Sequence, residues 1–147
     1  MVRIEFSVDV DRPPAEVFAY LTDAATLPEW QSTALSAHKL SNGPLQVGAQ
    51  IADERRFLGR HVESTVEVTE WEPEQLFSLK GTSGPIRFEV RHRLEPRDGR
   101  TCVRVEAQGE AVGLSRLAGP LAARTAEHEF KGDFRRLKKI LESSRPA

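Results

Sequence analysis

One histidine stands at a position where an alternating strand pattern predicts an apolar side chain. Between Ile86 and Leu94, apolar residues alternate with Arg and Glu, and His92 occupies a place in the apolar row. Such alternation is typical of a strand with one dry face. An imidazole on that face could act as a general acid, a general base or a hydrogen-bond anchor near neutral pH. The alternative is a core histidine bonded to a backbone group or to a buried carboxylate.

Two further polar residues interrupt apolar rows and could also supply chemistry. Asp133 shares a helical stripe with Phe130 and Leu137, at spacings of three and four residues. A buried carboxylate must find a donor, stay neutral or reach solvent. Asp133 could therefore pair with His92 and orient it, or it could bond a loop near one end of its helix. Ser64 interrupts the apolar row of a strand, where its hydroxyl could bond a ligand, the backbone or water.

A charged pair in the first half of the chain allows two interpretations. Asp53 and Arg55 share one face of a predicted strand from Ala49 to Leu58. They would line the mouth of a cavity if Ile51 and Phe57 point inward, or they would form a surface ion pair worth at most about 1 kcal/mol. The charge density of this stretch favours an edge or rim strand over a dry central one.

The composition excludes several kinds of site. The 147 residues include 21 Lys and Arg against 22 Asp and Glu, a balance without general attraction to nucleic acid or to an anionic membrane. Cys102 is the only cysteine, which excludes an intrachain disulfide and a multi-thiolate metal site. The histidines are scattered and no nucleotide-binding motif occurs, so we expect no metal and no cofactor. No apolar run suggests a membrane span or a signal peptide, and we expect a cytoplasmic protein.

The elements that must position these residues form one predicted α+β domain over residues 1–147. Alternation predicts a first strand from Val2 to Val10, and two short helical segments follow, from Ala15 to Leu21 and ending near Pro28. An amphipathic helix from Leu114 to Glu142 closes the chain and should kink or restart at Pro120. One helix across one antiparallel sheet would bury both apolar faces. The six later strands are predicted at Thr33–Leu40, Ala49–Leu58, His61–Trp71, Gln75–Lys80, Ile86–Leu94 and Thr101–Gly109, with a bulge near Trp71.

Several short motifs accompany this order of elements. They are Pro-Ala-Glu-Val-Phe at 14–18, Thr22 with Asp23, Trp30, Val-Gly-Ala at 47–49, Glu-Trp-Glu-Pro at 70–73, and Phe134 with Leu137 and Lys138. The combination resembles the START/Bet v 1-like (SRPBCC) superfamily, specifically its bacterial polyketide cyclase/dehydrase and lipid-transport branch. The resemblance implies a helix-grip fold, in which a seven-stranded antiparallel sheet wraps around the long C-terminal helix and encloses a cavity. Two short helices after the first strand belong to the same fold.

The resemblance also implies a small, largely apolar or aromatic ligand in the cavity, and we expect a monomer or homodimer. In an enzymatic version, His92 would remove an acidic proton from a poly-β-ketone and promote aldol closure, with help from Asp133 or Ser64. In a second version the same cavity serves a carrier or sensor, because fold alone does not choose among activities. A third class is a protein-interaction module that uses the charged rim at 53–56 and the outer rows at 87–93. The expected cavity residues are Trp30, Phe57, Ser64, Val66, Phe88, Val90, Ala126 and Phe130.

Overall fold

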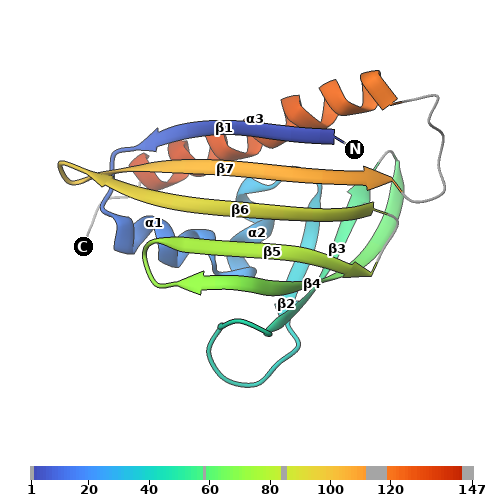
Figure 1. The fold of residues 1–147 in the computed structure, drawn as a ribbon, viewed down its shortest axis with the longest axis horizontal. Helices are drawn as coiled ribbons and strands as arrows, with labels where there is room; N and C mark the ends of the chain where they lie inside the picture. Colours follow the sequence, from blue (N-terminus) through green and yellow to red (C-terminus); the bar gives the residue numbers. More distant parts are fainter. Residues whose placement is uncertain (1, 58, 84–85, 112–118, 144–147) are drawn as a thin grey trace.

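The fold is one seven-stranded antiparallel sheet with a long helix across one of its faces (Figure 1). The computed structural model describes residues 2–57, 59–83, 86–111 and 119–143. The strands are β1 (Val2–Val10), β2 (Ala34–Lys39), β3 (Gln50–Phe57), β4 (Arg60–Glu72), β5 (Leu76–Ser83), β6 (Ile86–Arg97) and β7 (Arg100–Ala111). The helices are α1 (Pro14–Leu21), α2 (Leu27–Trp30) and α3 (Gly119–Ser143), with a 3-10 turn η1 (Ala24–Thr26) before α2. This architecture confirms the predicted helix-grip fold.

Strands β2 to β7 form a meander, and β1 lies at the edge of the sheet beside β7. The strand order is β1-β7-β6-β5-β4-β3-β2, so β2 to β7 each pair with the next strand and β1 pairs with β7. In the turn between β6 and β7, Asp98 and Gly99 both have positive φ, at 49° and 81°. Two central residues with positive φ match the right-handed twist of a tight hairpin, which explains the Asp-Gly sequence there.

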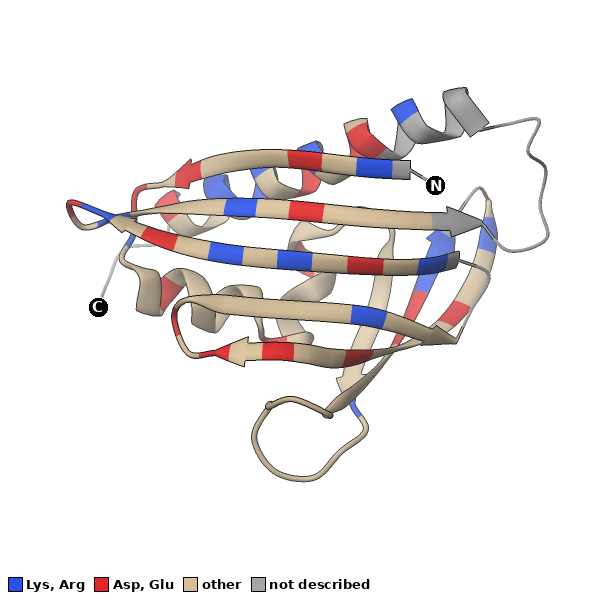
Figure 2. Ribbon diagram, in the orientation of Figure 1, with Lys and Arg blue, Asp and Glu red and all other residues tan. Residues whose placement is uncertain are grey.

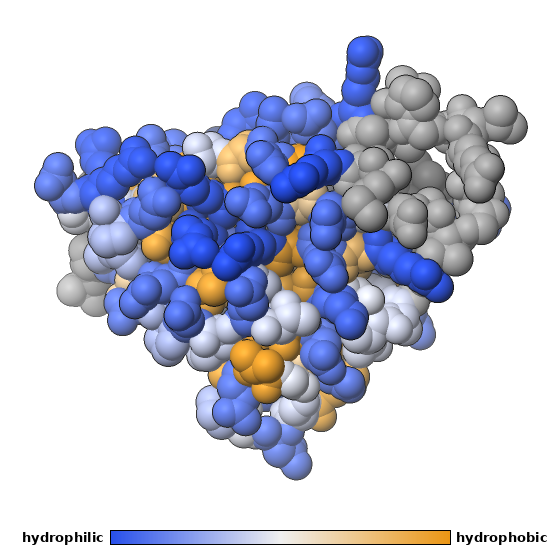
Figure 3. All heavy atoms as spheres, in the orientation of Figure 1, coloured by the Kyte–Doolittle hydropathy of each residue, from blue (hydrophilic) through white to orange (hydrophobic). Residues whose placement is uncertain are grey.

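Alternation along each strand divides the sheet into a charged outer face and an apolar inner face. In β1, Ile4 and Val10 are buried, whereas Arg3 and Glu5 are exposed. Val103 of β7, which pairs with β1, is fully buried as well. Figure 2 shows Lys, Arg, Asp and Glu distributed along the strands of the sheet, including the central strands β6 and β7, and Figure 3 shows the face turned to the viewer as mainly hydrophilic. The apolar inner rows therefore need a cover, which the helices supply.

Helix α3 lies behind β1 and β7 in the view of Figure 1 and buries Phe134, Leu137 and Leu141. Polar contacts fasten its last turns to the end of β1. Lys138 Nζ donates to the carbonyl oxygen of Asp9 at 2.6 Å. Near the end of the helix, Glu142 Oε2 accepts the backbone N–H of Asp11, the residue after β1, at 2.9 Å. The helix is thus held by apolar burial along its length and by hydrogen bonds at its C-terminal end.

The structure corrects or refines three details of the predicted elements. The charged strand β3 is not an edge strand, because it pairs with β2 on one side and β4 on the other. The bulge expected near Trp71 is present as a register shift between Val68 and Glu70 in the pairing of β4 with β5. Pro120 lies in the first turn of α3, where the missing N–H costs nothing. The predicted helical residues 114–118 lie outside the described residues.

Candidate ligand site between the sheet and the C-terminal helix

His92 lies in the interior, on the inner face of β6, with only 4% of its surface exposed. Its ring stacks on Phe77 with 5.5 Å between centroids and tilts against Phe134 of α3 at 5.8 Å. Nδ1 is 2.9 Å from the carbonyl oxygen of Phe77. A carbonyl only accepts hydrogen bonds, so Nδ1 carries the proton and Nε2 of the neutral ring is left as an acceptor.

This environment makes His92 a weak base. Burial lowers the pKa of the imidazole from 6.5 to about 4, and the bond to the Phe77 carbonyl opposes this only in part. A general base works best when its pKa lies near the operating pH. The ring is therefore neutral at pH 7. Its bond to the Phe77 carbonyl agrees with the alternative of a core histidine that bonds a backbone group.

Asp133 lies in the middle of α3 and bonds to the segment that follows α2. Its Oδ1 accepts the backbone N–H of Ser32 at 3.0 Å. Burial raises the pKa of the Asp133 carboxyl, and the Ser32 bonds together with the charges of Arg136 and Arg55 oppose that rise. Within the described part of the chain no hydrogen bond joins Asp133 to His92, so the two are not arranged as base and orienter. The predicted loop bond is present, though from mid-helix and not from a helix end.

A network of polar side chains lies on the inner face of β3 and β4. Asp53 is 4% exposed, and its carboxylate accepts the hydroxyl of Ser64 and the Nε–H of Arg55, the latter at 3.0 Å. Arg55 Nη1 also donates to Thr33 Oγ1 at 3.2 Å, at the start of β2. Because the register places Asp53 opposite Ser64, the strand pairing itself brings carboxylate and hydroxyl together. The pair is therefore interior, which excludes the surface ion pair and removes Asp53 from the exposed rim proposed for an interaction module.

The predicted aromatic wall divides into buried and accessible members. Trp30 is 1% exposed and packs on Phe134, with 5.1 Å between ring centroids. Its Nε1–H has no hydrogen-bond partner among the described residues. Phe88 and Phe130, in contrast, remain partly exposed although they face the interior. Val66 and Val90 are buried at 4% and 7% exposure. The side chains of Phe57 and Ala126 lie outside the part of the chain described.

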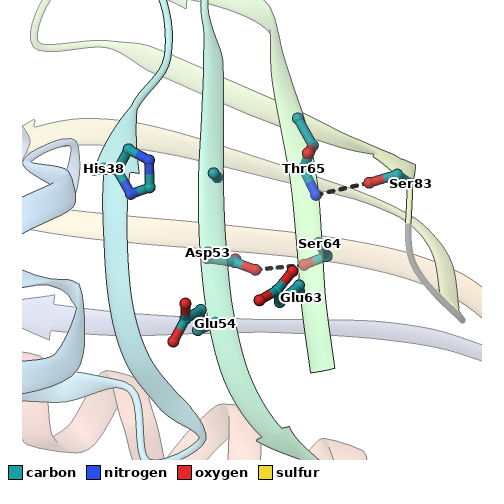
Figure 4. A pocket seen from close by; sticks show the side chains of 8 residues that line it. His38, Asp53, Glu54, Glu63, Ser64, Thr65 and Ser83 are labelled. Atoms are coloured by element: carbon teal, nitrogen blue, oxygen red, sulfur yellow. Dashed lines mark hydrogen bonds between the residues drawn. The ribbon is translucent and has the colours of Figure 1, made fainter. Parts of the chain in front are cut away.

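Residues of β2 to β5 line a groove of about 390 Å³, which includes Asp53 and Ser64 of the polar network (Figure 4). Glu54 and Glu63 are cross-strand partners on its wall, and His38 of β2 lies opposite Ala52 farther along the groove. His61 Nε2 lies 3.4 Å from Glu54 Oε2. Over the described ranges, no group of three or more His, Cys, Asp or Glu side chains could hold a metal ion. This acidic groove is consequently not a metal centre formed by those residues.

The sequence of this chain matches a known protein family over nearly its whole length. Residues 1–142 match the profile of the family described as "Polyketide cyclase / dehydrase and lipid transport". The chain belongs to this family. The uncharacterized protein Rv1546 of Mycobacterium tuberculosis is 27% identical over 136 residues, which cover 90% of this chain and 91% of that protein.

Two solved structures are similar to this chain over nearly its whole length. A START superfamily protein from Mycobacterium smegmatis superposes with a TM-score of 0.83 at 15% identity, over 97% of this chain and 98% of that one. The Zhui aromatase/cyclase from Streptomyces sp. R1128 gives a TM-score of 0.77 at 15% identity, over 95% and 93% of the two chains. At these identities the likeness shows the helix-grip fold alone. None of the helices in the described ranges has the length and apolar character to cross a membrane.

Sequence reasoning missed several residues of this family member's interior. Leu79 of β5 and Ala107 of β7 are partly buried on the inner face, beside the predicted Phe88. The alternation in Thr101–Gly109 predicts that Ala107 faces inward, but nothing in the sequence distinguished Leu79 or Ala107 from ordinary core. Ser32 and Thr33 anchor Asp133 and Arg55, and the only available signal was a pair of polar residues directly after Trp30.

Proposed function

We propose that this protein binds a small, largely apolar molecule between the inner face of the sheet and α3, with an oxygen-bearing group of the ligand beside Arg55 and Ser64. The supporting observation is a set of inner-face apolar side chains that the chain does not cover completely. At the α1 end, Val10, Val103 and Leu137 have no exposed surface. Elsewhere on the inner face Ile4 and Val90 are buried, but several apolar side chains stay partly exposed, namely Leu79, Phe88, Ala107 and Phe130. An apolar surface that the chain does not cover itself favours a ligand there.

The polar network defines what the ligand should carry at one end. A guanidinium has five N–H donors, and Arg55 uses its Nε–H on Asp53 and an Nη1–H on Thr33. The side chain is 27% exposed, so its remaining donors can reach a carbonyl, enolate or carboxylate oxygen. The ligand class is therefore an apolar or aromatic molecule with such an oxygen, as found in polyketide chains and fatty acids.

Simple binding, as in a carrier or sensor, is favoured over chemistry that uses His92. A pKa of about 4 leaves this imidazole with little basicity at pH 7. Cyclisation of a poly-β-ketone is the second candidate, and the position of Asp133 near the charge of Arg55 favours it. In that reaction the carboxylate would take a proton from the carbon between two carbonyls, and Arg55 would stabilise the enolate oxygen. The enolate carbon would then attack another carbonyl of the same chain, and the Asp133 carboxyl would return its proton to the alkoxide oxygen formed there.

Native mass spectrometry of the protein purified from its own host, before and after organic extraction, tests the proposal. We expect a co-purifying apolar molecule that extraction removes. Ala107→Phe should reduce rebinding about tenfold or more, because its ring would project from the inner face of β7 into the proposed site. Gln108→Phe is the matched control, since its side chain is exposed on the outer face of the same strand. A bare chain that binds none of a panel of polyketides, sterols and fatty acids would exclude the proposed ligand class.

A separate variant tests whether the residues around Arg55 bind an oxygen of the ligand. It must leave no buried charge unpaired. Replacing Asp53 and Arg55 together by Met removes both members of the ion pair. Affinity for a fatty acid should then fall about tenfold, while affinity for the corresponding hydrocarbon should stay unchanged. Equal loss for both ligands would contradict recognition of an oxygen at this end.

A further inference from the structure

Apolar side chains gather on the loop between β2 and β3, residues 40–49, which projects from the lower edge of the sheet (Figure 1). Leu40 is 51% exposed and Val47 is 60% exposed, and Pro44 between them is exposed as well. We call Leu40, Pro44 and Val47 the apolar tip. Of the three large hydrophobic residues that are exposed in the described chain, two belong to this tip, and Leu35 on β2 is the third. Figure 3 shows hydrophobic atoms at the bottom of the molecule, where the loop lies.

The loop holds these side chains outward on a defined backbone. Its base is closed by a bond from the Leu40 N–H to the Gln50 carbonyl at 2.8 Å, and by one from the Gly48 N–H to the Val68 carbonyl at 2.9 Å. Gly48 has a φ of +94°, a conformation that glycine adopts without strain. Leu45 turns the other way and packs against the core. The exposure of the apolar tip is thus a property of a folded loop that is anchored on both sides.

The charge around the tip suits a lipid surface. Residues 40–50 contain no charged side chain, and Figure 2 shows the whole loop without acidic or basic colour. The nearest charge along the chain is Lys39, an exposed cation whose Nζ donates to the Gly43 carbonyl. An acidic residue at this place would be repelled by anionic headgroups, whereas a lysine is attracted to them.

The size of the tip decides between a lipid surface and a protein partner. A specific protein interface needs about 20 residues on each side and matching shapes. Three side chains on a narrow loop supply neither, but a bilayer accepts single apolar side chains without shape complementarity. We propose that the apolar tip inserts into the surface of a lipid bilayer and docks the protein there.

Sedimentation with vesicles of neutral phosphatidylcholine, alone or with added phosphatidylserine, tests this proposal. The double variant Leu40→Ser, Val47→Ser should lower the partition coefficient roughly tenfold for each side chain removed from the bilayer. Leu35→Ser is the matched control, because it removes an exposed leucine outside the loop and should change nothing. Lys39→Gln should abolish the preference for anionic vesicles, which we expect to be about fivefold. All four residues are exposed, so the melting temperatures should agree with that of the wild type.

A site-specific probe gives a second readout that does not depend on removing side chains. A polarity-sensitive dye on Val47→Cys should shift to the blue with vesicles, while the same dye on Leu35→Cys should not. The native Cys102 is buried and will not compete for the label under native conditions. Equal sedimentation of wild type and double variant, or no spectral shift at position 47, would overturn the proposal. A concentration-dependent dimer that the double variant abolishes would instead identify a second copy of the chain as the occupant.

Discussion

Lowering the pH from 7 to 4 should destabilise the folded protein through His92, and the size of the effect follows from its burial. The ring is 4% exposed, stacked on Phe77, and its pKa is lowered from 6.5 to about 4. The unfolded chain therefore binds a proton at higher pH than the folded chain does. Stability is fully present above pH 6.5 and is lost as the pH falls from there toward 4.

The gap between the two pKa values sets the expected magnitude. At 1.36 kcal/mol for each pH unit, the full loss is about 3 kcal/mol. His92→Phe removes the titration but keeps a ring against Phe77. It should be less stable than the wild type by about 1 to 2 kcal/mol at pH 7.5, because the Phe77 carbonyl loses its partner. By pH 4.5 the order should be reversed or the gap closed.

Guanidinium chloride unfolding at pH 7.5, 6.5, 5.5 and 4.5 measures this directly. Other acidic groups titrate in both proteins, so the difference between the two free energies of unfolding isolates His92. His38→Gln is the matched control, because it removes an exposed imidazole on the outer face of β2. Parallel pH curves for wild type and His92→Phe would refute the reasoning and place the ring in contact with water.

Four further predictions can be measured by the same unfolding assay. Arg55→Met alone should cost about 3 kcal/mol, because it leaves the buried Asp53 carboxylate without its cation, and the double replacement by Met should cost less than that. Gly132→Ala should stabilise α3 by about 0.5 to 1 kcal/mol, since an added Cβ meets only the end of an arginine side chain at 4.0 Å. Gly109→Ala should destabilise by about 1 to 3 kcal/mol, because its Cβ would lie 2.9 Å from a backbone oxygen. Asp133→Ala should cost about 1 kcal/mol and Asp133→Asn less, because the amide oxygen can still accept from the backbone after α2.

The architecture was predictable because each element repeats a simple period. Alternation in β1 and β6 identified the strands within a few residues of their observed ends. The stripe that ends in Phe134, Leu137 and Leu141 identified the covering helix. The out-of-phase Trp71 even located the bulge, because an extra residue in one strand necessarily shifts the alternation after it.

The candidate site was less predictable, because its partners are distant or belong to the backbone. The charge-rich sequence of β3 looked like a rim, yet Asp53 is buried because Ser64 on the next strand and Arg55 satisfy its carboxylate. No sequence pattern records such compensation before the strand register is known. His92 and Asp133 each bond a backbone group, and a carbonyl or N–H is present at nearly every residue. The sequence could predict which face of a strand or helix holds a polar side chain, but it could not predict the group to which that side chain bonds.

The pairing of β1 with β7 has a consequence for how the chain must be made. Val2 lies opposite Gly109 and Val10 opposite Thr101, so β1 can pair only after the much later strand β7 has been synthesised. Contacts between such distant segments close slowly, because the long loop between them must first be ordered. Until then the Val-Ile-Phe-Val-Val row of β1 has no partner strand and is a hazard for aggregation. A nascent chain stalled before β7 should therefore depend on chaperones, and synthesis and release of β7 should end that dependence.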